Sequence, residues 1–130
     1  MASRFRLGFH VSIAGSIDKA VDLAVAMECN VFQMFTRNPR GWKYAPLDII
    51  EVEEFKRKVK KHGIDSVFVH MPYLPNLASS KEDVYKLSSA SLKEEVKRCS
   101  ILGVPFLVTH LGSHLGSGKT GGFKRIIWSI

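Results

Sequence analysis

The chain has 130 residues, of which 45% are hydrophobic, and a formal net charge of +7 from 19 Lys and Arg against 12 Asp and Glu. This length and apolar content are those of one small domain with enough apolar residues to build a core. No run of about 18 apolar residues is present, as a transmembrane helix requires, and no apolar segment follows the Arg-rich N-terminus to form a secretory signal. We therefore expect a cytoplasmic protein without membrane contact.

The positive charge and the cysteines add little about function. The charge favours a polyanionic partner such as nucleic acid, but much of it lies in residues 56–61, which form a solvated helix face. Cys29 and Cys99 fall inside predicted helices without metal-ligand spacing. We expect both to be buried, reduced thiols.

Strand and helix patterns alternate along the whole chain. Short apolar runs rich in β-branched and aromatic residues predict the strands. Apolar residues at i, i+3, i+4 and i+7 predict the helices that follow them, and Tyr85, Leu92, Val96 and Cys99 form the expected buried stripe of the third. Ser79 with Glu82 and Ser80 with Asp83 predict a capping box at the start of that helix. The strands are expected at 6–10, 31–35, 67–70 and 106–110, and the helices at 16–27, 47–61, 79–102 and 123–130.

Histidines mark the carboxyl ends of three predicted strands: His10, His70 and His110. In a parallel α/β architecture these ends share one face, and that face carries the chemistry. Four βα units of about 30 residues are consistent with an open doubly wound sheet, but the converging histidines favour a barrel. A complete (β/α)8 barrel needs roughly 250 residues. The fold class is therefore α/β, half of a (β/α)8 TIM barrel with about four parallel βα units.

Four segments of the chain carry a family resemblance. They resemble the endonuclease IV family of zinc-dependent apurinic/apyrimidinic (AP) endonucleases, in family order and at family spacing, from about residue 6 to 125. The segments are 8–15 (Gly-Phe-His-Val-Ser-Ile-Ala-Gly), 35–42 (Phe-Thr-Arg-Asn-Pro-Arg-Gly-Trp), 70–78 (His-Met-Pro-Tyr-Leu-Pro-Asn-Leu-Ala) and 110–116 (His-Leu-Gly-Ser-His-Leu-Gly).

The resemblance implies a xylose-isomerase-like TIM barrel with three zinc ions, which cleaves DNA 5′ to abasic sites in base excision repair and leaves a 3′-hydroxyl. By this resemblance His70 and His110 are two ligands of one zinc. His10 matches a motif position but is expected near the site, supporting a ligand or packing against it. The residues at DNA-contacting positions are Asn38, Arg40, Tyr73 and Leu74, which match positions that enter the minor groove and hold the abasic site out of the helix.

The chain departs from the family pattern in three ways. Leu111 stands where a proline commonly follows the ligand histidine, and Pro75 stands where an aliphatic residue is usual. The remaining zinc ligands of the family lie on later strands, beyond residue 130. We therefore expect an N-terminal part of the barrel, truncated after about the fourth strand, with an incomplete zinc site and little or no activity alone. Its exposed sheet edges favour self-association.

Two other interpretations remain open from the sequence. A sugar isomerase or epimerase of the related xylose-isomerase-like barrels would share the fold and a strand-end metal site, but has no use for the DNA-contacting loops. A non-catalytic half-barrel would bind DNA or a partner domain through the same loops but would catalyse no reaction.

Overall fold

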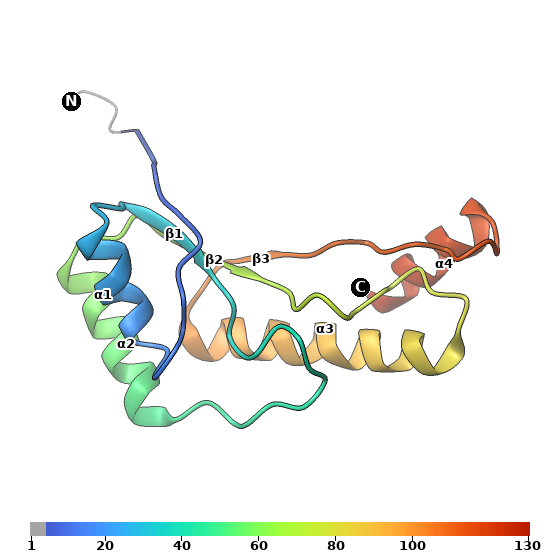
Figure 1. The fold of residues 1–130 in the computed structure, drawn as a ribbon, viewed down its shortest axis with the longest axis horizontal. Helices are drawn as coiled ribbons and strands as arrows, with labels where there is room; N and C mark the ends of the chain where they lie inside the picture. Colours follow the sequence, from blue (N-terminus) through green and yellow to red (C-terminus); the bar gives the residue numbers. More distant parts are fainter. Residues whose placement is uncertain (1–4) are drawn as a thin grey trace.

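The computed structural model describes residues 5–130 (Figure 1). Helices and strands alternate along this part of the chain. Within it, no helix combines the length and the apolarity needed to cross a membrane. The elements are α1 (Lys19–Ala26), β1 (Val31–Met34), α2 (Ile49–Lys61), β2 (Ser66–His70), α3 (Glu82–Leu102), β3 (Phe106–Val108) and α4 (Lys119–Ser129).

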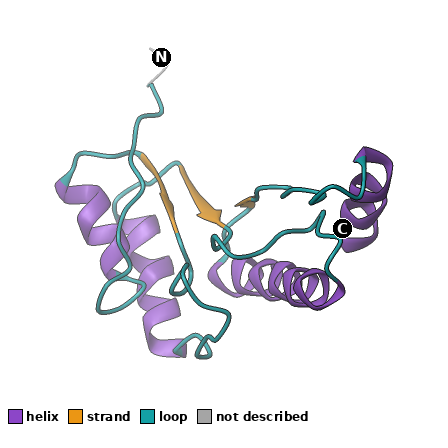
Figure 2. Cartoon of the chain, turned by 45° about the vertical axis from the view of Figure 1, so that its right-hand side comes forward, coloured by secondary structure: helices purple, strands orange, loops and turns teal. Residues whose placement is uncertain are grey.

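The three strands form a parallel sheet in the order β1-β2-β3. Phe32 pairs with Val67 in the first strand pair, and Val69 pairs with Leu107 in the second. Residues of α1, α2 and α3 share one core cluster with β1 and β2, so the three helices cover the same face of the sheet (Figure 2). Strands that neighbour each other in sequence also neighbour each other in the sheet, with a helix in each connection. This succession of βα units is the wall of a TIM barrel.

The expected first strand, at 6–10, is present only as an isolated parallel bridge between His10 and Gln33. The Phe9 carbonyl accepts from the Gln33 N–H, so the segment does run along β1. Further back, the Leu7 N–H donates to the side-chain oxygen of Asn30 at 2.7 Å instead of to a backbone carbonyl. The Asn30 N–H donates to the Leu7 carbonyl at 3.1 Å, so backbone contact continues beyond the bridge as far as Leu7.

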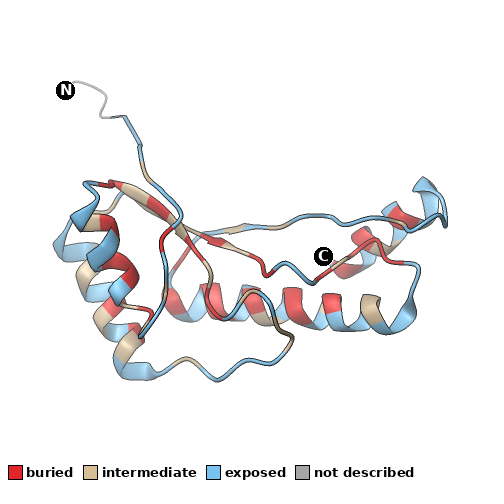
Figure 3. Ribbon diagram, in the orientation of Figure 1, coloured by how far each residue is buried: buried red, intermediate tan, exposed pale blue. Residues whose placement is uncertain are grey.

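The two faces of the sheet have different environments. Phe32, Met34, Val67 and Val69 alternate along β1 and β2 and are buried against the helices (Figure 3). The residues between them point to the other face, the inner face of the barrel wall. Phe106 and Val108 of β3 belong to this inner face and are largely exposed. The core therefore lies outside the barrel wall, between sheet and helices.

The long helix α3 differs from the sequence prediction at its start and along its buried side. The capping boxes predicted at Ser79 and at Ser80 are both wrong, because Lys81 is the N-cap residue and provides no side-chain cap bond. Val96 is 55% exposed. Polar residues take its place on the buried side, which consists of Ser88, Ser91, Leu92, Glu95, Arg98, Cys99 and Leu102.

Other local predictions can be compared directly with the structure. Helix α4 begins at Lys119, four residues before the predicted start. Gly103 has the left-handed φ of +70° that ends α3. Cys29 and Cys99 are buried free thiols, as expected, but only Cys99 lies in a helix, because Cys29 falls in the connection between α1 and β1. Burial, with Glu95 nearby, raises the pKa of Cys99 to about 11.

Candidate functional site: a histidine face at the strand ends

Three histidines lie together at the carboxyl ends of the strands. His70 closes β2, and its register partner in β3 is Val108, two residues before His110. The ring centroids of His70 and His110 are 5.1 Å apart. His10, held by its bridge to β1, has its ring centroid 6.5 Å from that of His70. The structure thus brings the three predicted side chains to one face.

Hydrogen bonds give two of these rings different tautomers. His70 Nδ1 lies 2.6 Å from the Met71 carbonyl oxygen. A carbonyl only accepts, so Nδ1 carries the proton and Nε2 keeps its lone pair. His10 Nδ1 lies 3.0 Å from the amide nitrogen of Gln33, which only donates, so in neutral His10 the proton is on Nε2. Partial burial and then the neighbouring His70 lower the pKa of His10, which favours its neutral form.

Phe35 lies at the centre of this face and was not singled out from the sequence. Its ring centroid is 4.5 Å from that of His10, 5.6 Å from that of His70 and 5.2 Å from that of Tyr73. The sheet register accounts for this position. Because Met34 pairs with Val69, the next residue along, Phe35, comes level with His70. Phe35 is therefore an apolar contact shared by His10, His70 and Tyr73.

The predicted DNA-contacting residues lie on two loops that touch. Asn38 and Arg40 are exposed, and the Asn38 side-chain oxygen accepts the Arg40 N–H at 3.0 Å. Tyr73 is 61% exposed and Leu74 40%. The Tyr73 N–H donates to the carbonyl oxygen of Pro39 at 3.0 Å and joins the two loops. All four side chains are exposed to solvent.

Asn76 connects the loop after β2 with the loop after β3. Its side-chain oxygen accepts the Ser113 N–H at 2.9 Å, and its amide nitrogen donates to the Ser113 carbonyl at 3.0 Å. Gly112, at φ +91°, leaves the room for this contact, because a Cβ there would lie 2.0 Å from the Asn76 oxygen. Of the two departures from the family pattern, Pro75 is buried and Leu111 is 48% exposed.

A complete metal site is not present in the part of the chain that the structure describes. Residues 5–130 contain no group of three or more His, Cys, Asp or Glu side chains placed to hold a metal ion. His70 and His110 are a pair of imidazoles. Catalytic zinc sites usually have three protein ligands, so any metal bound here needs at least one more.

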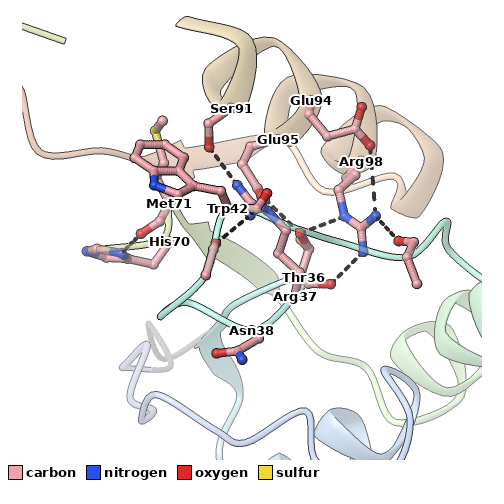
Figure 4. Close-up of polar contacts among 12 residues, drawn as sticks. Thr36, Arg37, Asn38, Trp42, His70, Met71, Ser91, Glu94, Glu95 and Arg98 are labelled. Atoms are coloured by element: carbon pink, nitrogen blue, oxygen red, sulfur yellow. Dashed lines mark hydrogen bonds and ion pairs between the residues drawn. The ribbon is translucent and has the colours of Figure 1, made fainter. Parts of the chain in front are cut away.

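A buried ion pair behind the loop that carries Asn38 and Arg40 was also missed from the sequence. Arg37 Nε donates to Glu95 of α3 at 2.6 Å, and both side chains are buried (Figure 4). A signal was available, since Ser91, Glu95 and Arg98 recur at the i, i+4, i+7 spacing of a single helix face. Apolar periodicity alone does not detect a polar stripe.

Comparison with known proteins places this geometry in a family. The family model described as "Xylose isomerase-like TIM barrel" matches residues 21–130. The chain belongs to this family. Within it, the resemblance to endonuclease IV is confirmed. The chain is 54% identical over 124 residues to the probable endonuclease 4 of Nitrosopumilus maritimus, a match that covers 94% of the chain and 44% of the relative.

Two solved structures resemble the chain to different degrees. The crystal structure of endonuclease IV from Thermus thermophilus superposes with a TM-score of 0.85 at 33% identity, over 96% of the chain and 45% of that protein. A D-psicose 3-epimerase superposes with a TM-score of 0.65 at 12% identity, a likeness of fold alone. The chain thus spans a little under half the length of its relatives, which confirms the half-barrel prediction.

Proposed function

We propose that this chain provides part of a zinc-dependent AP endonuclease, which cleaves the phosphodiester 5′ to an abasic site and leaves a 3′-hydroxyl. One observation carries the proposal. Two histidines at the carboxyl ends of neighbouring strands lie beside two joined loops that expose Asn38, Arg40, Tyr73 and Leu74. This arrangement occurs in a chain similar to proteins named endonuclease 4.

The histidine pair suits zinc as part of its ligand set. Met71 holds the Nδ1 proton of His70, so the Nε2 lone pair is available, and neutral imidazole is a preferred zinc ligand. His110 supplies a second imidazole beside it. Bound zinc supplies Lewis-acid activation for phosphodiester hydrolysis. His10 packs against Phe35 and accepts a hydrogen bond from Gln33 near the pair, and it is not proposed as a ligand.

The loops suit an abasic site in duplex DNA. Exposed Tyr73 and Leu74 form an apolar wedge of the kind that enters the minor groove and opens a base step. Arg40 adds a charge for the groove or the phosphates beside it. Extruding an abasic nucleotide costs little, because no base has to be unstacked. The loops therefore select DNA in which a base is already missing.

Residues 1–130 are expected to bind such DNA without cutting it at a useful rate. The described residues 5–130 supply two histidines and no third metal ligand beside them. Incision is proposed to need further carboxylate and histidine ligands that these residues do not provide. Zinc-dependent incision of an abasic duplex by the purified chain would contradict this part of the proposal.

A binding titration tests the proposed specificity. The chain is titrated into a fluorescein-labelled duplex with one tetrahydrofuran abasic analogue and into the same duplex with an intact base pair, and fluorescence anisotropy is recorded. We expect at least about tenfold tighter binding to the abasic duplex, which is 1.4 kcal/mol, and weaker binding to both as salt rises. Equal affinity for the two duplexes would contradict the proposal.

A further inference from the structure

Helix α3 presents a polar face to the loop formed by residues 36–45. Ser91, Glu95 and Arg98 lie on this face, one helical turn apart (Figure 4). Glu95 is 0% exposed, Arg98 4%, and Arg37 of the loop 5%. Burying charged side chains is costly unless each has a partner, so a cluster this deep needs well-placed hydrogen bonds.

Every nitrogen of the Arg37 guanidinium donates such a hydrogen bond. Nε donates to Glu95 Oε1 and Nη2 donates to Ser91 Oγ, each at 2.6 Å. Nη1 donates to two loop carbonyls, that of Gly41 at 3.1 Å and that of Trp42 at 3.4 Å. Arg37 therefore ties the middle of the loop to α3.

Arg98 holds the two ends of the same loop. Its Nε and Nη2 donate to the hydroxyl and the carbonyl of Thr36, at 2.9 and 2.7 Å. Its Nη1 donates to the Ala45 carbonyl at 2.9 Å. The Thr36 hydroxyl in turn donates to Glu95 Oε2 at 2.7 Å, so Glu95 orients both arginines. Burial lowers the pKa of Arg98, and the nearby Glu95 and Glu94 oppose that shift.

The cluster fixes backbone atoms on both sides of the exposed residues Asn38 and Arg40. It also acts on the second loop, because the Pro39 carbonyl lies between these anchors and accepts the Tyr73 N–H. The loop has few apolar anchors of its own, since residues 43–46 are all exposed. Its shape therefore depends on polar contacts with α3.

We propose that Arg37, Glu95 and Arg98 are positioning residues that hold the two DNA-contacting loops in their binding shape before DNA arrives. This inference rests on the proposed function. A loop that is already ordered in the free protein loses little conformational entropy when DNA binds. The smaller entropy cost makes the binding tighter. The cluster touches no DNA itself, because its charged groups are buried and already paired.

The variant R37K separates positioning from the ion pair. Lysine keeps the positive charge beside Glu95, but a single ammonium cannot also reach Ser91 and the carbonyls of Gly41 and Trp42. S91A is a milder second variant, which removes one contact of Arg37 and leaves Glu95 untouched. R57K is the matched control, because Arg57 forms a similar two-bond pair with Glu54 on the exposed side of α2.

Two readouts are measured for each variant. In a W128F background Trp42 is the sole tryptophan, and acrylamide quenching of its fluorescence reports the order of the loop without DNA. Anisotropy titration reports affinity for the abasic and intact duplexes. We expect R37K to increase the quenching and to weaken abasic binding about tenfold, S91A to do the same to a smaller degree, and R57K to change neither.

Each other outcome has a definite meaning. Unchanged quenching in folded R37K would overturn the inference, since Arg37 then does not hold the loop. Increased quenching with unchanged abasic affinity would also overturn it and leave the proposed function standing. A wild-type chain without preference for the abasic duplex would overturn the proposed function, and the DNA role of the cluster with it.

Discussion

Changing Glu95 to glutamine is expected to lower the free energy of unfolding by about 3–5 kcal/mol, the usual cost of removing one partner from a buried ion pair. Glutamine has the same shape but no charge. It leaves Arg37 buried beside a neutral amide, and only one of its two terminal atoms can accept from Thr36 or Arg37, where Glu95 accepts from both. Urea unfolding followed by circular dichroism measures the difference.

The matched control is Glu53→Gln. Glu53 pairs with Lys56 on the exposed face of α2, where its side chain is 65% exposed. Exposed pairs contribute about 0–1 kcal/mol, so this change should hardly move the unfolding midpoint. Equal effects of the two substitutions would show that the Glu95 cluster contributes no more than a surface pair and would contradict its structural role.

Changing His70 to alanine is expected to weaken zinc binding at the strand-end face. Long-range ¹H–¹⁵N spectra of the imidazoles report each ring nitrogen, and zinc should shift His70 Nε2 and His110 together in the wild-type chain. In His70→Ala the shift at His110 should need at least about tenfold more zinc, since even a change beside a ligand costs about 10–100-fold in affinity. The physical reason is that one imidazole then remains where two lie together.

His62→Ala controls for the loss of any histidine. His62 is exposed and follows α2 as its C-cap residue, away from the strand ends. Its removal should leave the zinc titration unchanged. Zinc-induced shifts at His62 or His114, with none at His70, would show that the strand-end pair is not the zinc site.

The sequence was most informative in segments where the apolar residues follow a single helical or strand period. The alternation of apolar strands and amphipathic helices predicted the parallel βα units, because each element buries one face by its own period. The strand-end histidines could be placed together without coordinates, because parallel strands align their carboxyl ends. Four motifs in register then identified the family.

The parts that escaped prediction depend on side chains that act far along the chain. The Asn30 side chain binds the backbone of the first segment at Leu7, which no local pattern shows. In the sequence Glu95 and Arg98 look like solvated helix residues. In the fold they are hydrogen-bonded to Arg37 and Thr36, which lie 58 to 62 residues earlier in the chain. Phe35 becomes central only through the sheet register. Tertiary contacts decide all three cases.

The most direct test of the account is where on the chain abasic DNA binds. The measurement compares the affinity of Arg40→Ala and Lys60→Ala for the abasic duplex by anisotropy. Arg40 lies on the loop beside the histidine face, and Lys60 lies on α2, within the most basic stretch of the chain. We predict about tenfold weaker binding for Arg40→Ala and a change of less than about twofold for Lys60→Ala. The reverse order would place DNA on the lysine-rich helix and contradict the assignment of the strand-end face.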